Sequence, residues 1–213
     1  MEAITANAME NHVHISRGIT KLGAAIPSIN LPPGQTCRPD APCFRLCYAR
    51  RGRFSFSHTK DLLRQNLDLW SNDPERYERE VECAAYTSRF FRFHSSGDIP
   101  DKLYLDMMTR VANRCPNTSF LCFTKKYELV NSFINLHGIH NLPPNLRIVL
   151  SAWGSFVPDN PHNLPVAYIK LRKEPTAIPE DARMCSGYCG ECVATGRSCW
   201  DLKPGESVCF NQH

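Results

Sequence analysis

Apolar positions along the chain follow a helical period in some stretches and form continuous apolar runs in others. Leu63, Leu67 and Trp70 recur at helical spacing, which predicts one buried helix face. Asp73 and Pro74 predict the start of the next helix, because Asp caps a helix and Pro suits its first position. Helices are predicted over residues 58–71, 74–87, 100–115 and 127–136.

Short apolar and aromatic runs between these helices predict strands. They cover residues 89–94, 119–123, 146–151 and 165–169. Strands that alternate with helices in this way indicate an α/β fold with a parallel sheet and crossover helices. The chain has 213 residues, and a complete eight-stranded barrel takes about 250. A partial (β/α) barrel or an open parallel sheet is therefore expected.

Three segments differ in pattern. Residues 1–25 are polar and read as an N-terminal arm, and residues 26–180 carry the α/β partial-barrel domain together with a cysteine loop. Hydrophobic periodicity fades beyond residue 180, where cysteines and glycines become frequent. Residues 181–213 are therefore interpreted as a Cys-rich metal-binding tail that packs on the same domain.

Composition limits the compartment and the partners. A hydrophobic fraction of 42% suffices for a buried core, and a formal charge of +4 is too mild to indicate nucleic-acid binding by itself. No run of 18 apolar residues exists, so no membrane contact is expected. The N-terminus lacks the basic and apolar regions of a signal peptide, which favours the cytoplasm. Cytoplasmic thiols stay reduced, so the 11 cysteines are not expected to form disulfides.

Four cysteines lie close together near the C-terminus, separated by three, two and six residues. They are Cys185, Cys189, Cys192 and Cys199. Four close thiolates suit a [4Fe–4S] cluster or a tetrahedral zinc ion. Structural zinc more often uses two short pairs joined by a longer loop, so the spacing favours the cluster. Zinc and thiols without metal remain alternatives.

Three further cysteines form a loop near the N-terminus. Cys37, Cys43 and Cys47 are separated by five and three residues. Three thiolates can hold three irons of a [4Fe–4S] cluster and leave the fourth iron open to a ligand. A shared zinc ion or simple packing are the alternatives. The isolated Cys83 and Cys122 lie in apolar stretches and are expected to be buried as small hydrophobic side chains.

Polar residues follow three of the predicted strands. Because ligands collect beyond the carboxyl ends of parallel strands, these residues are candidates for binding a charged cofactor. They are Ser96, Gly97, Asp98, Lys125 and Ser151. Asp98 has an alternative role as the cap of the helix that starts near Pro100. His94, at the end of the first of these strands, is either part of this polar edge or a histidine buried in the core.

A basic run follows the first cysteines. Arg45, Arg50, Arg51 and Arg53 have no acidic residue between them, and Phe54 and Phe56 lie nearby. Such a run contacts phosphates in nucleic-acid-binding proteins, and in others it forms a solvated face.

Residues 26–49, 91–129 and 146–154, together with the terminal cysteines, resemble the phage gene-88 product family of phages and bacterial mobile elements. That family is distantly similar to radical S-adenosylmethionine enzymes. The resemblance implies a partial barrel, with Cys37, Cys43 and Cys47 as the cluster loop. It places Gly97 and Asp98 at the methionine end of the cofactor, and it makes the four C-terminal cysteines an auxiliary cluster site.

The cysteine spacing departs from that of the radical enzymes. Their loop has gaps of three and two residues, which occur here at Cys185, Cys189 and Cys192 instead, with Glu191 where an aromatic residue is usual. The sequence therefore favours an iron–sulfur protein of phage or mobile-element type, with a radical S-adenosylmethionine-like enzyme as one form of it. The alternatives are a zinc-binding nucleic-acid-binding module and a phage-encoded interaction protein with a structural metal.

Overall fold

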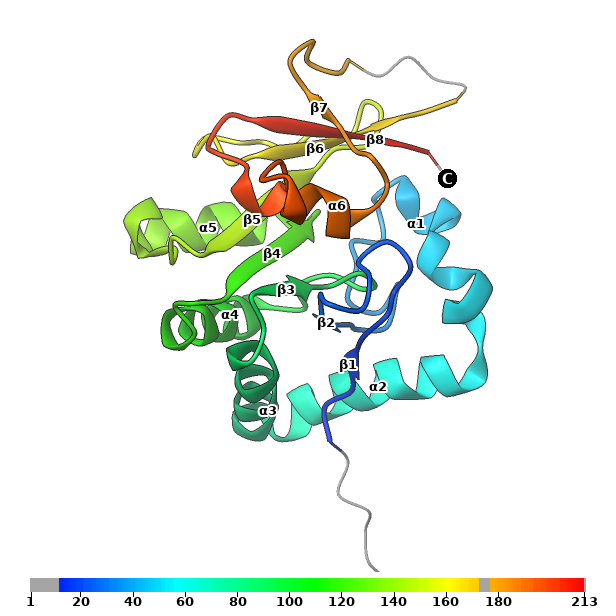
Figure 1. Ribbon diagram of the computed structural model, residues 1–213, viewed down its shortest axis with the longest axis vertical. Coiled ribbons are helices and arrows are strands. Elements are labelled where there is room, and N and C mark those ends of the chain that lie inside the picture. The colour runs from blue at the N-terminus through cyan, green and yellow to red at the C-terminus, as the bar shows by residue number, and fades with distance from the viewer. Residues whose placement is uncertain (1–11, 173–176, 213) are drawn as a thin grey trace, which may run out of the picture.

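A computed structural model describes residues 12–172 and 177–212, and in it eight strands form one sheet (Figure 1). Their order across the sheet is β1-β2-β3-β4-β5-β6-β8-β7. The strands are β1 (Ile15–Ser16), β2 (Ser28–Ile29), β3 (Phe90–Phe93), β4 (Ser119–Thr124), β5 (Leu146–Ser151), β6 (Val166–Lys170), β7 (Arg183–Met184) and β8 (Ser207–Asn211). All neighbours pair in parallel except β1 with β2. The prediction of an α/β fold with a mostly parallel sheet is thus confirmed.

Four long helices connect the strands, and each begins and ends within two residues of its predicted bounds. They are α2 (Ser57–Asn72), α3 (Pro74–Tyr86), α4 (Lys102–Arg114) and α5 (Tyr127–His137). The Asp73 side chain accepts a hydrogen bond from the backbone N–H of Arg76 and caps α3, as predicted. In the described part of the chain, none of the helices has the length and apolar character needed to cross a membrane.

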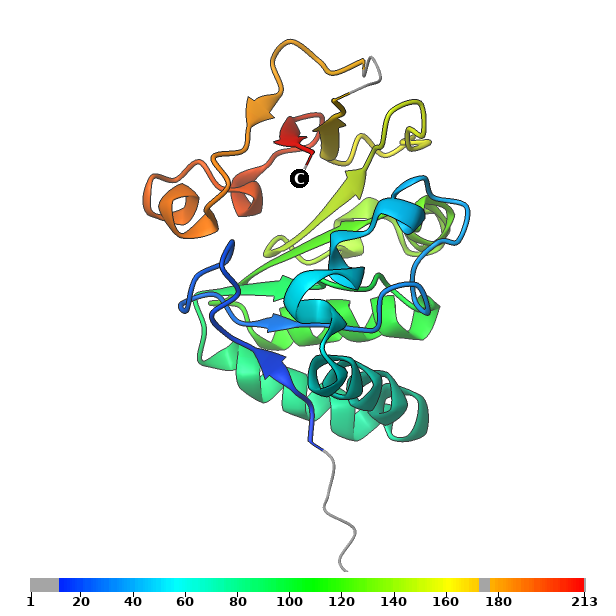
Figure 2. The ribbon, with the colours of Figure 1, turned by 90° about the vertical axis from the view of Figure 1, so that its right-hand side faces the viewer.

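The two faces of the sheet are covered by different parts of the chain. Side chains alternate across a strand, so Phe120 and Cys122 of β4 pack with α3, α4 and α5. Leu121 faces the other way and packs with Trp200 and Leu202 of the C-terminal segment. Figure 2 shows the long helices and α6 (Cys189–Ala194) on opposite sides of the sheet. We call the side covered by the C-terminal segment the inner face.

The sheet is open. Its strand order runs from β1 at one edge to β7 at the other, and no pairing within the described ranges joins these two edges. Trp200 lies on the inner face, where its indole N–H donates to the carbonyl of Phe91 at 3.3 Å. The C-terminal segment therefore covers the inner face of an open sheet.

Both termini differ in detail from the sequence expectation. Part of the predicted arm, residues 1–11, lies outside the described residues, whereas residues 15–16 form the edge strand β1. The C-terminal segment packs on the same domain and also contributes β8, which lies between β6 and β7. Strand β8 was not predicted, because hydrophobic periodicity fades in this cysteine-rich segment and its parallel neighbours are remote in the sequence.

Candidate functional site

The carboxyl ends of β2 to β5 meet at one edge of the sheet, which follows from their parallel pairing. The cysteine loop follows β2 and leads into the short helix α1 (Cys43–Leu46). The exits of β3 and β4 carry Asp98 and Lys125, so the structure brings three of the predicted site regions together.

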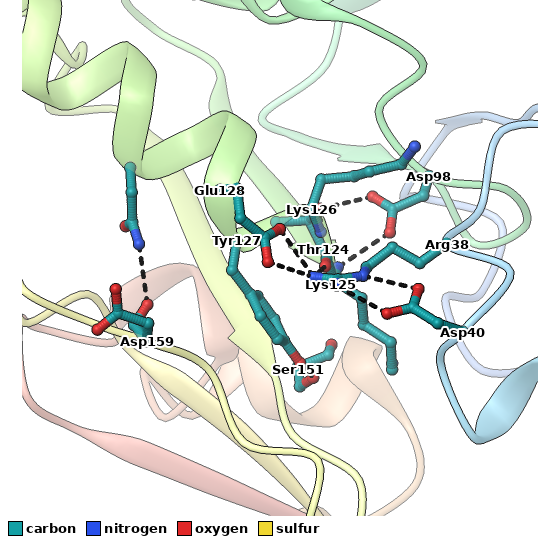
Figure 3. A network of polar contacts seen from close by, with 11 residues as sticks. Arg38, Asp40, Asp98, Thr124, Lys125, Lys126, Tyr127, Glu128, Ser151 and Asp159 are labelled. Atoms are coloured by element: carbon teal, nitrogen blue, oxygen red, sulfur yellow. Dashed lines mark hydrogen bonds and ion pairs between the residues drawn. The ribbon is translucent and has the colours of Figure 1, made fainter.

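Asp98 connects the exits of β3 and β4. Its carboxylate is 6% exposed and accepts hydrogen bonds from Thr124 Oγ1 at 2.6 Å and from the N–H of Lys125 at 2.9 Å (Figure 3). The N–H of Ile99 is a third donor, at 2.8 Å. Burial raises the pKa of Asp98, although these hydrogen bonds act in the opposite direction.

The alternative role of Asp98 as a helix cap is wrong. The N-cap of α4 is Asp101, whose side chain accepts from the N–H of Tyr104 at 2.9 Å. Asp98 lies three residues earlier, and its oxygens are taken by donors from β4 and its own loop. It is therefore a connection between two strand exits.

Ser96 and Gly97 have roles in packing. The hydroxyl of Ser96 is buried and donates to the carbonyl of Leu31 at 3.0 Å. Gly97 has a φ of 80°, and a Cβ there would lie 2.8 Å from the Leu31 carbonyl oxygen and from Thr36 Oγ1. Both residues thus allow the exit of β3 to dock closely against the exit of β2.

Ser151, the last predicted member of the edge, ends β5. Its carbonyl accepts a hydrogen bond from the hydroxyl of the buried Tyr127, the first residue of α5 (Figure 3). This contact links the exit of β5 to the start of the helix that follows β4.

A clamp built on Arg38 holds the cysteine loop in place. Its guanidinium donates to Glu128 at 2.7 Å and to Asp40 at 2.8 Å, with a further bond to the carbonyl of Lys125 at 3.3 Å (Figure 3). The hydrogen bond that Arg38 donates to Asp40 is the main reason that the pKa of Arg38 is raised. Sequence reasoning missed this residue, because its partner Glu128 is 90 residues away.

The three cysteines of this loop are neighbours of one another and of Asp98. Burial raises the pKa of Cys37 to about 11, and the nearby Asp98, Cys47 and Cys43 add to the increase. Burial also raises the pKa of Cys43, while the adjacent Lys125 ammonium opposes the shift through charge and a hydrogen bond. The structure thus places three half-buried thiols beside one carboxylate and one ammonium.

The four C-terminal cysteines form a second group, against the inner face. Burial raises the pKa of Cys199 to about 12, and the other three cysteines add to the increase. Helix α6 starts at Cys189, whose N–H donates to the carbonyl of Lys21 at 2.8 Å. The hydroxyl of Ser186 lies 3.3 Å from Cys192 Sγ. These contacts fix the group beside the β1–β2 connection.

Arg92 supplies positive charge beside this second group. Its guanidinium lies over the ring of Phe123 at 4.3 Å and donates to the carbonyls of Phe93 and His94 at 3.3 Å. Burial raises the pKa of Cys189 and Cys199, and the positive charge of Arg92 lowers it in part. In the sequence, Arg92 could have been identified as a candidate site residue because it is the one charged residue of the otherwise aromatic strand β3.

The isolated cysteines have different environments. All eleven cysteines are free thiols, and Cys122 is buried as predicted, 4.0 Å from His94 Nδ1. The expectation that Cys83 is buried is wrong, because this residue lies on the exposed side of α3. His94 is a core histidine with its Nε2 3.1 Å from the Tyr104 hydroxyl.

Each of the two groups of thiols contains enough cysteines to form a metal centre. Within residues 12–172 and 177–212, no three His, Cys, Asp or Glu side chains are arranged to hold a metal ion as they stand. The donor chemistry fits a thiolate-bound metal, since each group contains at least three thiols near a positively charged side chain.

A family model described as gene product 88 matches residues 5–201, which include both groups of cysteines. The chain belongs to the gene product 88 family. No curated protein and no solved structure matches this gene product 88 protein. The resemblance stated from the sequence is thus confirmed for the family, and the more distant similarity to radical S-adenosylmethionine enzymes remains a prediction.

Proposed function

We propose that this gene product 88 protein is an iron–sulfur protein with two thiolate-bound centres. Cys37, Cys43 and Cys47 would bind one centre at the carboxyl edge of the sheet. The second would be bound on the inner face by Cys185, Cys189, Cys192 and Cys199. The observation that carries the proposal is the division of these seven thiols into two groups, each beside a positively charged side chain.

The cations are an argument for clusters with net negative charge. A [4Fe–4S]²⁺ centre bound by four thiolates carries about −2, and one bound by three carries about −1. Lys125 lies beside the first group, and Arg92 and Lys21 lie beside the second. These side chains reduce the cost of holding thiolates in a partly buried site.

The first group is the better candidate for binding a small molecule. Three cysteines leave one iron of a [4Fe–4S] cluster without a protein ligand, and such a cluster supplies one-electron chemistry. Lys125 is half-buried at this edge and can meet a carboxylate of the ligand. Asp98 acts as a positioning residue, because its carboxylate accepts from the N–H of Lys125 and its own N–H donates to Thr36 Oγ1, next to Cys37, at 3.0 Å. S-adenosylmethionine is the ligand class that we propose to test.

Metal analysis of the anaerobically reconstituted protein tests the two centres. We expect a brown protein with about eight irons and eight sulfides per chain. Cys37→Ala and Cys192→Ala should each lose about half of both, because the two groups bind independently. Cys83→Ala removes an exposed thiol of α3 and is the matched control. A colourless protein with stoichiometric zinc would contradict the proposal, and so would loss of all iron in either variant.

Equilibrium dialysis against S-adenosylmethionine separates the two centres by role. The reconstituted wild type and Cys192→Ala are expected to bind it, and Cys37→Ala is expected to lose binding at least tenfold, because only the first group has an open iron. Equal binding by both cysteine variants would exclude the carboxyl edge as the ligand site.

A further inference from the structure

Four arginines are exposed on the segment that follows the cysteine loop. They lie in α1, in η1 (Tyr48–Arg50), in η2 (Gly52–Ser55) and between these two turns. We call this segment, residues 44–56, the basic surface. Its arginines are Arg45, Arg50, Arg51 and Arg53.

The charge of the basic surface is not balanced by acids. Residues 41–60 contain neither Asp nor Glu. Among the residues that the structure describes, none of these four arginines has an ion-pair partner. By contrast, every arginine of α3 and α4 pairs with a glutamate of α3. Unpaired guanidinium groups at this density attract a polyanion.

Aromatic side chains lie among these arginines and are unusually exposed. Phe56 is 63% exposed and Tyr48 is 58% exposed. The hydroxyl of Tyr48 donates to the carbonyl of Ser95, which fixes the tyrosine at the exit of β3. Arg50 lies over the ring of Phe44 at 4.2 Å from its centroid, so the surface also contains an ordered stack of a guanidinium on an aromatic ring.

We propose that the basic surface binds single-stranded nucleic acid. Guanidinium groups contact the phosphates of any nucleic acid, but exposed aromatic rings add affinity only where bases are free to stack on them. A duplex buries its bases in stacked pairs, and an acidic protein surface has no bases that could stack on the rings. The surface lies on the same segment as Cys43 and Cys47, so a bound strand would pass beside the carboxyl edge of the sheet.

Fluorescence anisotropy with labelled oligonucleotides of about 20 nucleotides tests this proposal. The probes are a single strand of DNA, the same sequence as RNA, the DNA duplex, and heparin as a competitor without bases. We expect the single strands to bind more tightly than the duplex. The logarithm of the association constant should fall linearly with the logarithm of the salt concentration.

Three variants separate charge from stacking. The double variant Arg51→Gln with Arg53→Gln should reduce the salt slope by about 1.4, because each phosphate contact on a single strand contributes about 0.7. Phe56→Ala should weaken single-strand binding about tenfold and leave the salt slope unchanged. The matched control removes two exposed charges from α3 and α4 by Arg79→Gln with Lys102→Gln, and wild-type affinity is expected for it.

The outcomes distinguish a single strand from other anions. No binding of single strands at about 50 mM salt overturns the proposal. So does equal binding of duplex, heparin and single strand with no effect of Phe56→Ala, which would indicate a surface for anionic proteins or for polyanions in general. Thermal unfolding monitored by circular dichroism verifies that each variant is folded. Because no cysteine is changed, the result is independent of the proposed iron–sulfur centres.

Discussion

His94 is expected to make the protein sensitive to acid. Burial lowers the pKa of His94 to about 3, compared with 6.5 for an unperturbed histidine, and the charge of Arg92 acts in the same direction. Between these values the unfolded chain binds a proton that the folded chain does not. The free energy of unfolding should therefore fall as the pH falls through this window, by about 3 kcal/mol between pH 6.5 and pH 4.

Urea unfolding at a series of pH values measures this contribution. His94→Asn removes the titrating group, and asparagine tolerates the φ of 61° at this position. The variant should show a shallower loss of stability with acid than the wild type, whatever its stability at neutral pH. His137→Asn changes an exposed histidine at the end of α5 and is the control. Parallel pH profiles for the wild type and His94→Asn would contradict the assignment.

Replacing Asp98 with alanine is expected to lower the free energy of unfolding by about 2–4 kcal/mol. The change removes the acceptor of three hydrogen bonds and leaves the N–H groups of Ile99 and Lys125 buried without it. Each unsatisfied donor costs about 1–3 kcal/mol. The buried carboxylate itself is poorly solvated, so its removal recovers part of this loss.

Two further variants identify the source of the loss. Asp98→Asn keeps the volume but turns an N–H group toward one of the donors, so it should also destabilise the protein. Thr124→Val removes one of the three hydrogen bonds to Asp98 and also the acceptor of the Lys126 N–H, so it is expected to cost about 1–2 kcal/mol. Asp68→Ala, at an exposed position of α2, is the control. Wild-type stability of Asp98→Ala would contradict a stabilising connection between the strand exits through this carboxylate.

Asp98 and the Arg38 clamp act on the same loops. Asp98 joins the exits of β3 and β4, and Arg38 joins the cysteine loop to the start of α5. Together they fix Cys37, Cys43 and Lys125 relative to one another before any ligand binds. A buried carboxylate and a multiply bonded arginine thus hold these side chains in place in advance, as the proposed binding of a ligand at the carboxyl edge would require.

The local sequence determined the regular elements of the fold. The helices α2 to α5 and the strands β3 to β6 lie where hydrophobic periodicity predicted them, because each element buries one continuous face. The cap of α3 was also predictable, since Asp73 and its donor Arg76 are three residues apart. The cysteine loop and the strand exits could be located because parallel strands end at one edge.

Only the tertiary structure decided which chemistry each candidate has. Asp98 and Asp101 both precede α4, and either could cap it. Asp101 is the cap. Asp98 is instead bound by Thr124 and Lys125 at the exit of another strand. The clamp between Arg38 and Glu128, and the position of Arg92 beside the C-terminal thiols, likewise join residues remote in the chain. Local periodicity contains no information about such contacts, because they form only when separate elements pack together.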